Sequence, residues 1–239
     1  FPLTKCPYVM PEVIGEAKKS LPPDLFKQEF EAAFIDSSND VFVGIDQVST
    51  VNEYDLRKQD VFVGIDTGLT GDMSVVTLIN SVGKVVFIDN NNKQSINLIA
   101  DRFKDVLSRY NIVGGFIETN GIGRAMYDLI QPFYRKIKAF TTTQDSKMEM
   151  VRKLIHDVET LTIELPNDEL CPELHREFSE YSYKLSTTGK LSFGHIPGGH
   201  DDYIDSLMLA NFSRVKFMDR KPIRVVGLRN TQPMFKSPQ

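Results

Sequence analysis

The segment 61–76, VFVGIDTGLTGDMSVV, constrains the fold more than any other part of the sequence. Its first apolar run ends in an acid, Asp66, and a turn rich in Gly and Thr separates this run from a second apolar run that begins at Met73. An apolar run, an acid and a Gly-rich turn in this order are typical of a buried central β-strand that carries a carboxylate to the edge of a sheet. The alternative is a β-hairpin in which Asp66 only caps the turn.

The rest of the sequence predicts an α/β fold. Three consecutive hairpin strands, followed by alternating helices and strands, indicate a mixed β-sheet flanked by helices, with an auxiliary β-hairpin. Ser146 and Glu149 have the spacing of a capping box, which would start a helix at Ser146. The apolar patterns predict strands at 61–66, 73–80, 84–89, 113–118, 137–140 and 161–165, helices at 24–34, 95–110, 122–131, 146–160, 168–179 and 201–217, and a hairpin over 181–193.

The first forty residues resemble a linker that leads into this domain. Residues 1–23 contain five of the 12 prolines and show no sustained periodicity. The heptapeptide DVFVGID occurs at 40–46 and again at 60–66. Because nothing after Asp46 resembles the Gly-rich turn after Asp66, we interpret the first copy as an edge or lead-in strand and Asp46 as structural.

Composition excludes some classes of protein. No apolar run approaches the roughly 18 residues that a membrane span needs, there is no signal peptide, and the hydrophobic content of 41% suits a soluble globular domain. Cys6 and Cys171 lie far apart and match no metal or redox spacing, so a reducing, intracellular compartment is expected. The net charge of −4 does not suggest nucleic-acid binding, but basic residues dominate from Arg214 onward. The tail 219–239 is therefore either a solvated end or an arm that contacts phosphates.

Acidic residues recur where predicted elements end or begin. Asp66 ends one strand, Glu118 ends another, and Asp201, Asp202 and Asp205 open the last helix. If the two strands are parallel neighbours, their carboxylates emerge at one sheet edge, where the helix start can meet them. Each acid alone has an ordinary alternative as a helix cap or dipole partner; on the apolar pattern of the helix, Asp201 is expected to be the cap.

Crowded carboxylates need a cation to neutralise them. An all-oxygen ligand set favours Mg²⁺ or Mn²⁺ over Zn²⁺. Two such ions about 3.5–4 Å apart are a known device for phosphodiester hydrolysis. The sequence therefore predicts a two-ion hydrolytic site at this sheet edge.

This arrangement resembles the ribonuclease H-like nuclease fold and, more narrowly, the C-terminal nuclease domain of the terminase large subunit of tailed phages and herpesviruses. The segment 21–42 also resembles the piece that joins the motor ATPase to the nuclease in that family, so the resemblance covers roughly residues 21 to 215. The segments that carry it are GIDTGLTGDMSVV (64–76), FIETNGIGRAMYDLI (116–130), FTTTQDSKMEMVRKLI (140–155), STTGKLSF (186–193) and GHDDYIDSLMLA (199–210).

The resemblance implies Asp66, Glu118 and Asp202 as catalytic, metal-binding acids, with Asp205 or Asp201 as a further ligand. It implies a two-metal-ion endonuclease, with Mg²⁺ or Mn²⁺, that cuts concatemeric double-stranded viral DNA during packaging in the host cytoplasm. It also implies partners: the terminase ATPase domain, the small terminase subunit and the portal protein, with no membrane.

No segment matches the phosphate-binding loop of the family's ATPase half. We therefore expect 1–40 to be a linker from a missing ATPase domain, 41–218 to be the nuclease domain and 219–239 to be a basic tail. The expected DNA contacts are Lys190 on the hairpin, Lys147, Arg214 and Lys216, although exposed Lys and Arg residues are often only solvated.

Three other functions remain open from the sequence. A junction resolvase or transposase core would use the same acids on a different DNA substrate. An actin-like or sugar-kinase-type ATPase is suggested by Gly-Ile-Asp-Thr-Gly-Leu-Thr, 64–70, but that fold repeats the motif in a second half that this sequence lacks. A non-catalytic module that docks on a portal or motor would leave the acids as solvated turns.

Overall fold

The computed structural model describes residues 2–20, 26, 30–32, 41–68, 73–185, 191–196 and 198–218. Its centre is a five-stranded sheet in the order β3-β2-β1-β4-β5. Strand β1 is antiparallel to β2 and parallel to β4, β2 is antiparallel to β3, and β4 is parallel to β5. The strands are β1 (Asp60–Asp66), β2 (Ser74–Asn80), β3 (Val85–Asn91), β4 (Asn111–Glu118) and β5 (Ile137–Phe140). The predicted mixed sheet is confirmed.

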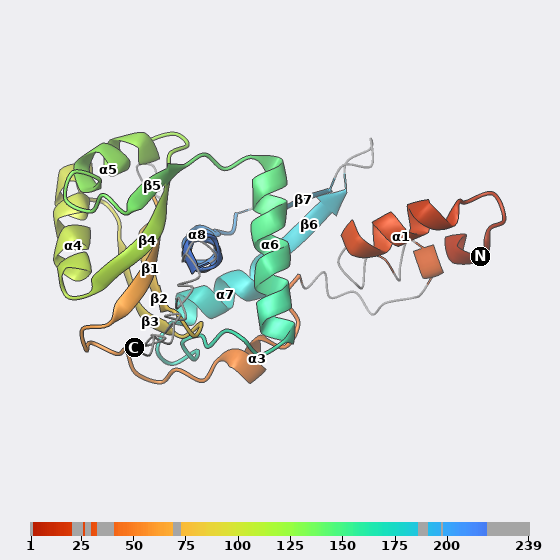
Figure 1. Cartoon of the computed structure of the whole chain (residues 1–239), viewed down its shortest axis with the longest axis horizontal. Helices are drawn as coiled ribbons and strands as arrows, with labels where there is room; N and C mark the ends of the chain where they lie inside the picture. The colour runs from red at the N-terminus through yellow and green to blue at the C-terminus, as the bar shows by residue number, and fades with distance from the viewer. Residues whose placement is uncertain are drawn as a thin grey trace, which may run out of the picture.

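Helices cover both faces of this sheet (Figure 1). Helices α4 (Ile96–Ser108) and α5 (Gly123–Ile130) cover one face, and α8 (Asp202–Met218) lies along the other. Helices α6 (Gln144–Glu159) and α7 (Pro172–Glu180) pack against α8. None of the described helices has the length and apolar content needed to cross a membrane.

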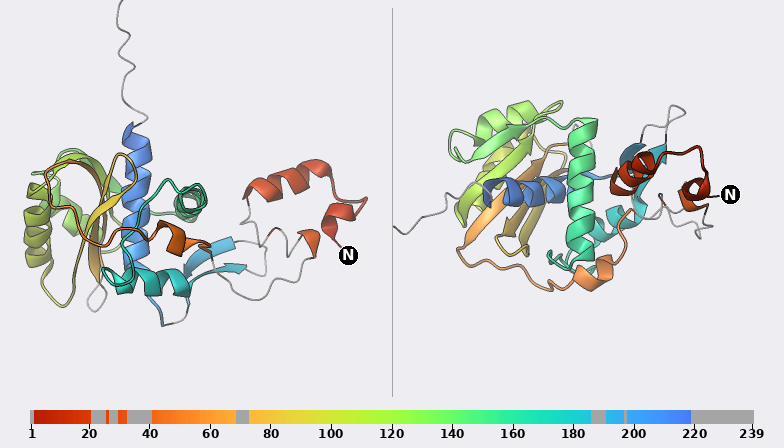
Figure 2. Two further views of the ribbon diagram at one scale, coloured as in Figure 1. Left: turned by 90° about the horizontal axis from the view of Figure 1, so that it is seen from below. Right: turned by 45° about the vertical axis from the view of Figure 1, so that its right-hand side comes forward.

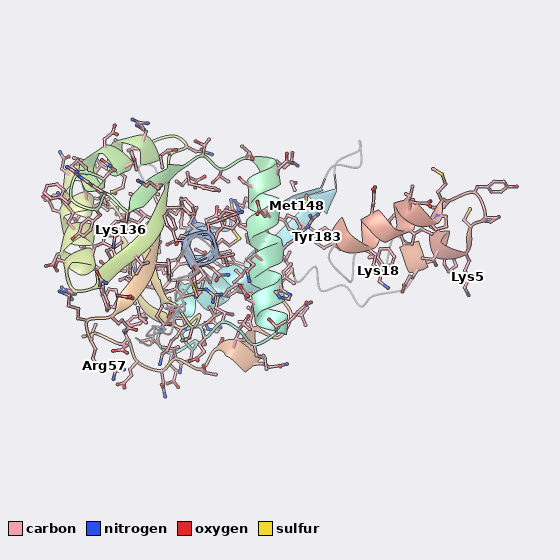
Figure 3. All side chains as sticks on the ribbon, in the orientation of Figure 1. Lys5, Lys18, Arg57, Lys136, Met148 and Tyr183 are labelled. Atoms are coloured by element: carbon pink, nitrogen blue, oxygen red, sulfur yellow. The ribbon has the colours of Figure 1, made fainter. Side chains whose placement is uncertain are left out.

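A separate hairpin and a short N-terminal part complete the described structure. Strands β6 (Tyr181–Leu185) and β7 (Leu191–His195) form the predicted hairpin, in which Tyr183 faces Phe193. Both of these rings pack against the core beneath α8, and Figure 3 labels Tyr183 beside α6, near Met148. The remaining elements are η1 (Leu3–Lys5), α1 (Pro11–Ser20) and α3 (Ile45–Val48), with α1 drawn apart from the sheet in Figure 2.

The pleat of β1 sorts its side chains into two cores. Val61, Val63 and Ile65 are buried among residues of α4 and α5, whereas Phe62 is buried in the core that contains α8. Successive side chains of a strand point to opposite faces, so Gly64 and Asp66 share the α8 face with Phe62. Each buried Val or Ile stabilises the fold by on the order of 2 kcal/mol.

Gly64 allows α8 to lie directly on the sheet. A Cβ atom at this position would stand 2.1 Å from the carbonyl oxygen of Ser206 and 2.3 Å from the backbone nitrogen of Ala210. The Ser206 hydroxyl donates to the carbonyl of Gly64 at 3.1 Å, which fixes the helix along the strand. Further along α8, the ring of Phe217 occupies the space above Gly114 near the start of β4. Helix α8 therefore runs antiparallel to β1 and β4, and its N-terminus lies at the edge where these strands end.

The prediction of a strand over the first DVFVGID copy is wrong. Residues 41–44 form no strand, and α3 spans Ile45–Val48. Gly44 has a φ of 85°, a left-handed conformation that stops an extended run. Phe42 packs its ring against Phe178 and Tyr181 at centroid distances of 5.1 and 5.3 Å. Tertiary packing of the aromatic ring replaces strand pairing for this copy.

Other element boundaries also differ from the predictions. Residues 161–165 form no strand: their backbone pairs with the sheet through an isolated bridge between Lys84 and Glu164. Helix α6 begins two residues early because Thr143, not Ser146, is its cap: Ser146 donates its backbone N–H to the Thr143 hydroxyl. Helix α1 occupies part of the expected linker. The predicted helix 24–34 lies mostly outside the described residues, as do the hairpin tip 186–190 and the tail 219–239.

Candidate functional site

Two carboxylates end neighbouring parallel strands. Ile65 of β1 pairs with Ile117 of β4, so the next residues, Asp66 and Glu118, end the two strands side by side. Both face α8, because their side chains alternate with those of Ile65 and Ile117, which are buried on the opposite face. Asp66 is only 9% exposed and accepts a hydrogen bond from the backbone N–H of Thr67 at 3.0 Å.

The first turn of α8 brings further acids to the same edge. Ser206 lies over Gly64, and Asp202 and Asp205 precede it in the first turn of α8, on the side of Asp66. Both acids act electrostatically on Asp66. The Asp205 side chain is 15% exposed, but its Oδ1 atom is buried without a hydrogen-bond partner among the described residues. The structure therefore brings together four acids that the sequence predicted to converge.

A lysine from α6 enters this acid cluster. The Nζ atom of Lys147 lies 2.9 Å from Oδ2 of Asp201 and 2.9 Å from Oδ2 of Asp205. The Lys147 side chain is 21% exposed, and its ammonium lies 6.0 Å from the centre of the Tyr181 ring. Burial lowers the pKa of Lys147, but the charges of Asp205 and Asp201 raise it by more, so the side chain stays charged.

One lysine does not neutralise all of this negative charge. Burial raises the pKa of Asp66 well above its usual range, and the charge of Asp205, a hydrogen bond to Glu118 and the charge of Asp202 raise it further. Burial also raises the pKa of Asp205 to about 7, with Asp201 and Glu118 adding to the effect and Lys147 opposing it. Raised carboxyl pKa values mark a place where an additional cation would be stabilising.

The donor chemistry of the cluster fits a hard divalent cation. Its groups are carboxylates, and oxygen ligands suit Mg²⁺ and Mn²⁺. The buried, unpartnered oxygen of Asp205 is a polar atom that such an ion would satisfy. As the side chains stand, no three described His, Cys, Asp or Glu residues form a group that could hold a metal ion. In this arrangement Asp201 and Asp205 are both paired with Lys147. The acidic side chains must therefore rearrange before they can coordinate an ion together.

The predicted DNA-contacting residues lie in different surroundings. Lys147 lies within the acid cluster. Arg214 is 11% exposed, 3.4 Å from Asp157, and its guanidinium donates to Asn211 at 2.9 Å. Lys216 is 44% exposed and pairs with Glu149 at 3.0 Å. Lys190 lies outside the described residues. The DNA-binding roles of these four residues stay predictions.

A hollow of about 250 Å³ adjoins Lys147 between α6 and the hairpin. It lies where the start of α6 faces β7, and Lys147, which pairs with Asp201 and Asp205, is part of its lining. The residues that line it are Thr142, Thr143, Gln144, Lys147, Ser192 and Phe193.

Sequence reasoning missed Glu177. The prediction that Asp201 caps α8 is wrong: the Asp201 carboxylate accepts from Lys147, and Oε2 of Glu177 accepts the backbone N–H groups of Tyr203 at 2.9 Å and Ile204 at 3.0 Å. Burial raises the pKa of Glu177 to about 8. One feature of the sequence could have indicated this role: Glu177 is an acid on the apolar stripe of α7, three residues after Leu174 and next to Phe178.

Comparison with known proteins consistently finds terminase proteins. Residues 63–214 match the family model described as the Terminase RNaseH-like domain. The large terminase subunits of Thermus virus P23-45 and Thermus phage G20c are each 25% identical over 201 residues, an alignment that covers 79% of this chain. It covers 41% of each relative, so this chain spans less than half the length of these proteins.

Solved structures share the fold. The large terminase nuclease of the thermophilic phage G20c with bound magnesium matches with a TM-score of 0.62 at 20% identity, over 74% of this chain and 98% of that one. The same nuclease with bound cobalt gives a TM-score of 0.62 at 21% identity, over the same shares of both chains. The large terminase of a second thermophilic bacteriophage matches with a TM-score of 0.60 at 13% identity, over 89% of this chain and 54% of that one. At these identities the likeness shows a common fold.

Proposed function

Because the chain belongs to the Terminase RNaseH-like domain family, we propose that it is the nuclease domain of a phage large terminase and cuts double-stranded DNA with divalent metal ions. The observation that carries the proposal is the convergence of Asp66, Glu118, Asp202 and Asp205 at one sheet edge. The proposed substrate is concatemeric viral DNA during genome packaging in the host cytoplasm. Residues 1–40 would link it to the motor ATPase, 41–218 form the nuclease, and 219–239 are a basic tail.

Each acid has a part in holding the ions. Asp66 lies between Glu118 on the sheet and the acids of α8, so it can bind a metal ion together with acids on either side. Asp202 and Asp205 share one helix turn and would hold an ion from the helix side. Bound Mg²⁺ or Mn²⁺ ions would supply an activated water and stabilise charge on the leaving oxygen. The surroundings of Asp66 are buried. This burial keeps bulk water from the carboxylate and strengthens its electrostatic effect.

The DNA strand would enter from the side of the hairpin. The hollow that Lys147 lines at the start of α6 is the proposed point of entry. Lys190, which lies between β6 and β7 in the sequence, and Lys216 near the end of α8 are the further proposed phosphate contacts. Metal ions that bind Asp205 would compete with Lys147 and leave its ammonium available for the strand. The motor ATPase, the small terminase subunit and the portal protein are the proposed partners of the complete protein.

A plasmid cleavage assay tests the proposal. The wild-type protein is expected to nick and linearise plasmid DNA with Mn²⁺ or Mg²⁺ and to stop in a chelator. Asp66→Asn is expected to abolish cutting, whereas Asp46→Asn is a matched control, because Asp46 follows the same six residues but lies exposed on α3. Cutting by the Asp66→Asn variant, or in the presence of chelator, would refute the proposal. Preferential cutting of four-way junctions over linear duplex would point instead to a resolvase.

A further inference from the structure

Glu177 is a buried carboxyl that the proposed chemistry does not use. Its side chain comes from α7, is 2% exposed, and ends at the first turn of α8. One oxygen, Oε2, accepts the N–H groups of both Tyr203 and Ile204. The first N–H groups of a helix have no partner within the helix, so a side chain from another element must satisfy them when they are buried.

The two bonds fall between two of the proposed metal ligands. Tyr203 and Ile204 separate Asp202 from Asp205, so the backbone that carries these acids is held on both of its middle residues. We propose that Glu177 is a positioning residue: it fixes the first turn of α8 and thereby sets where Asp202 and Asp205 stand relative to Asp66. This inference rests on the proposed function, in which these acids hold the metal ions.

The turn needs such a restraint because its own side chains repel one another. Asp201, Asp202 and Asp205 lie within one turn, and Asp66 lies beyond them. Lys147 restrains Asp201 and Asp205 by their side chains, whereas Glu177 bonds directly to the backbone of this turn. Helix α7 holds Glu177 in a fixed position relative to α8. Leu174 and Phe178 on the same helix are buried in the same core as Tyr203 and Ile204.

A purely structural role for Glu177 can be separated from a positioning role. Gln at this position keeps an acceptor oxygen for both N–H groups, whereas Ala leaves them buried without a partner. Leu174→Ala on α7 is a matched control: it opens a cavity one turn earlier on the same helix and loosens its packing without touching either bond. The affinity for a metal ion distinguishes the two roles, because only a displacement of the first turn of α8 moves Asp202 and Asp205.

The experiment measures two quantities that do not depend on DNA cleavage. Calorimetric titration gives the Kd for Mn²⁺, and amide hydrogen exchange in metal-free protein reports on Tyr203 and Ile204. For Glu177→Ala we expect the Kd to rise by about tenfold or more, as for other residues that orient metal ligands, and exchange at both amides to accelerate by about tenfold. Glu177→Gln is expected to stay within about threefold of wild type in both measurements. Leu174→Ala is expected to lower the melting temperature while its Kd also stays within that limit.

Either of two binding results would overturn the inference: a Kd for Mn²⁺ that Glu177→Ala leaves unchanged, or an equal rise of the Kd in Leu174→Ala. Unchanged exchange at Tyr203 and Ile204 in Glu177→Ala would also overturn it, even if wild type bound no Mn²⁺; absent binding alone would instead refute the proposed metal site. If Glu177→Ala does not fold, Glu177→Asp replaces it, because the shorter side chain withdraws the acceptor and keeps a carboxyl group. That variant is then expected to show the same rise in Kd.

Discussion

The ammonium nitrogen of Lys147 lies 2.9 Å from the Oδ2 atom of Asp205, and this pair joins α6 to the first turn of α8. The same nitrogen reaches Asp201 at 2.9 Å. A single cation from one helix thus neutralises part of an acid cluster assembled from the sheet and another helix. In the metal-free protein, the stability of the site depends on this internal countercharge.

Replacing Lys147 by Met is therefore expected to destabilise the metal-free protein. Removing one partner of a largely buried ion pair leaves uncompensated carboxylates, which costs about 3 kcal/mol in the free energy of unfolding. Added Mn²⁺ should recover much of this loss, because it supplies the missing positive charge. Denaturant unfolding in chelator and in Mn²⁺ measures both quantities. Lys216→Met, which breaks an exposed pair with Glu149, should cost less than about 1 kcal/mol; equal costs would contradict the argument.

The stability of the metal-free protein should fall as the pH rises. The pKa of Asp205 is raised to about 7 and that of Glu177 to about 8, so the folded state holds these protons more tightly than the unfolded chain does. Their contribution to stability is full below the ordinary carboxyl pKa and is lost as the pH passes through about 7 to 8. Melting temperatures in chelator at pH 5, 6, 7 and 8 should decline. The decline should be shallower in Asp205→Asn; an identical profile would show that Asp205 does not titrate in this range.

Gly64→Ala should displace α8 from the sheet. The new Cβ would meet the backbone of Ser206 at 2.1 Å, and backbone cannot move aside as a side-chain tip can. We expect a loss of about 3 kcal/mol in unfolding free energy, together with weaker Mn²⁺ binding, because the acids of α8 move with the helix. Gly15→Ala in α1 is the control, since a Cβ there meets nothing within 4 Å. Its effect should stay within about 1 kcal/mol; a larger effect than that of Gly64→Ala would contradict the packing argument.

Arg214 and Lys216 should respond differently to loss of charge. Arg214→Met should lower the unfolding free energy by about 2–3 kcal/mol, because buried Asp157 loses a partner, and it should leave the salt dependence of DNA binding unchanged. Lys216→Met should barely change stability but should reduce the slope of log affinity against log salt by about one if Lys216 contacts a phosphate. Fluorescence anisotropy at several salt concentrations measures the slope. A reduced slope for Arg214→Met would place this side chain on the DNA after all.

The sequence predicted the sheet and the convergence of acids well, for physical reasons. Buried strands such as β1 and β4 are nearly continuous apolar runs, so the acids that end them, Asp66 and Glu118, are easy to see. Helix α8 shows itself by its acidic start and apolar body. The parallel pairing of β1 with β4 follows from two reversals and one crossover: β2 and β3 each reverse the chain, and helix α4 then carries it from β3 to β4. These features depend on local pattern and simple topology.

Contacts between distant elements were not predictable in the same way. Lys147 and Asp205 are 58 residues apart, and no local pattern states that α6 and α8 will meet. The bonds from Glu177 to Tyr203 and Ile204 likewise depend on the packing of two helices. The two copies of DVFVGID show the same limit: the second copy becomes β1 because β2 and β4 flank it, whereas Phe42 of the first copy is buried against other aromatic rings.

The position of α8 in the chain determines when the site can exist during synthesis. The ribosome makes every strand of the sheet, and therefore Asp66 and Glu118, before it makes α8. A nascent chain that has completed the sheet still lacks Asp202 and Asp205. The face of β1 at Gly64, on which α8 packs, is then still exposed to solvent. The ability to cut DNA would therefore arise at a late step, as α8 docks. In the proposed nuclease, the acid cluster is therefore complete only once the last described helix of the domain has been made.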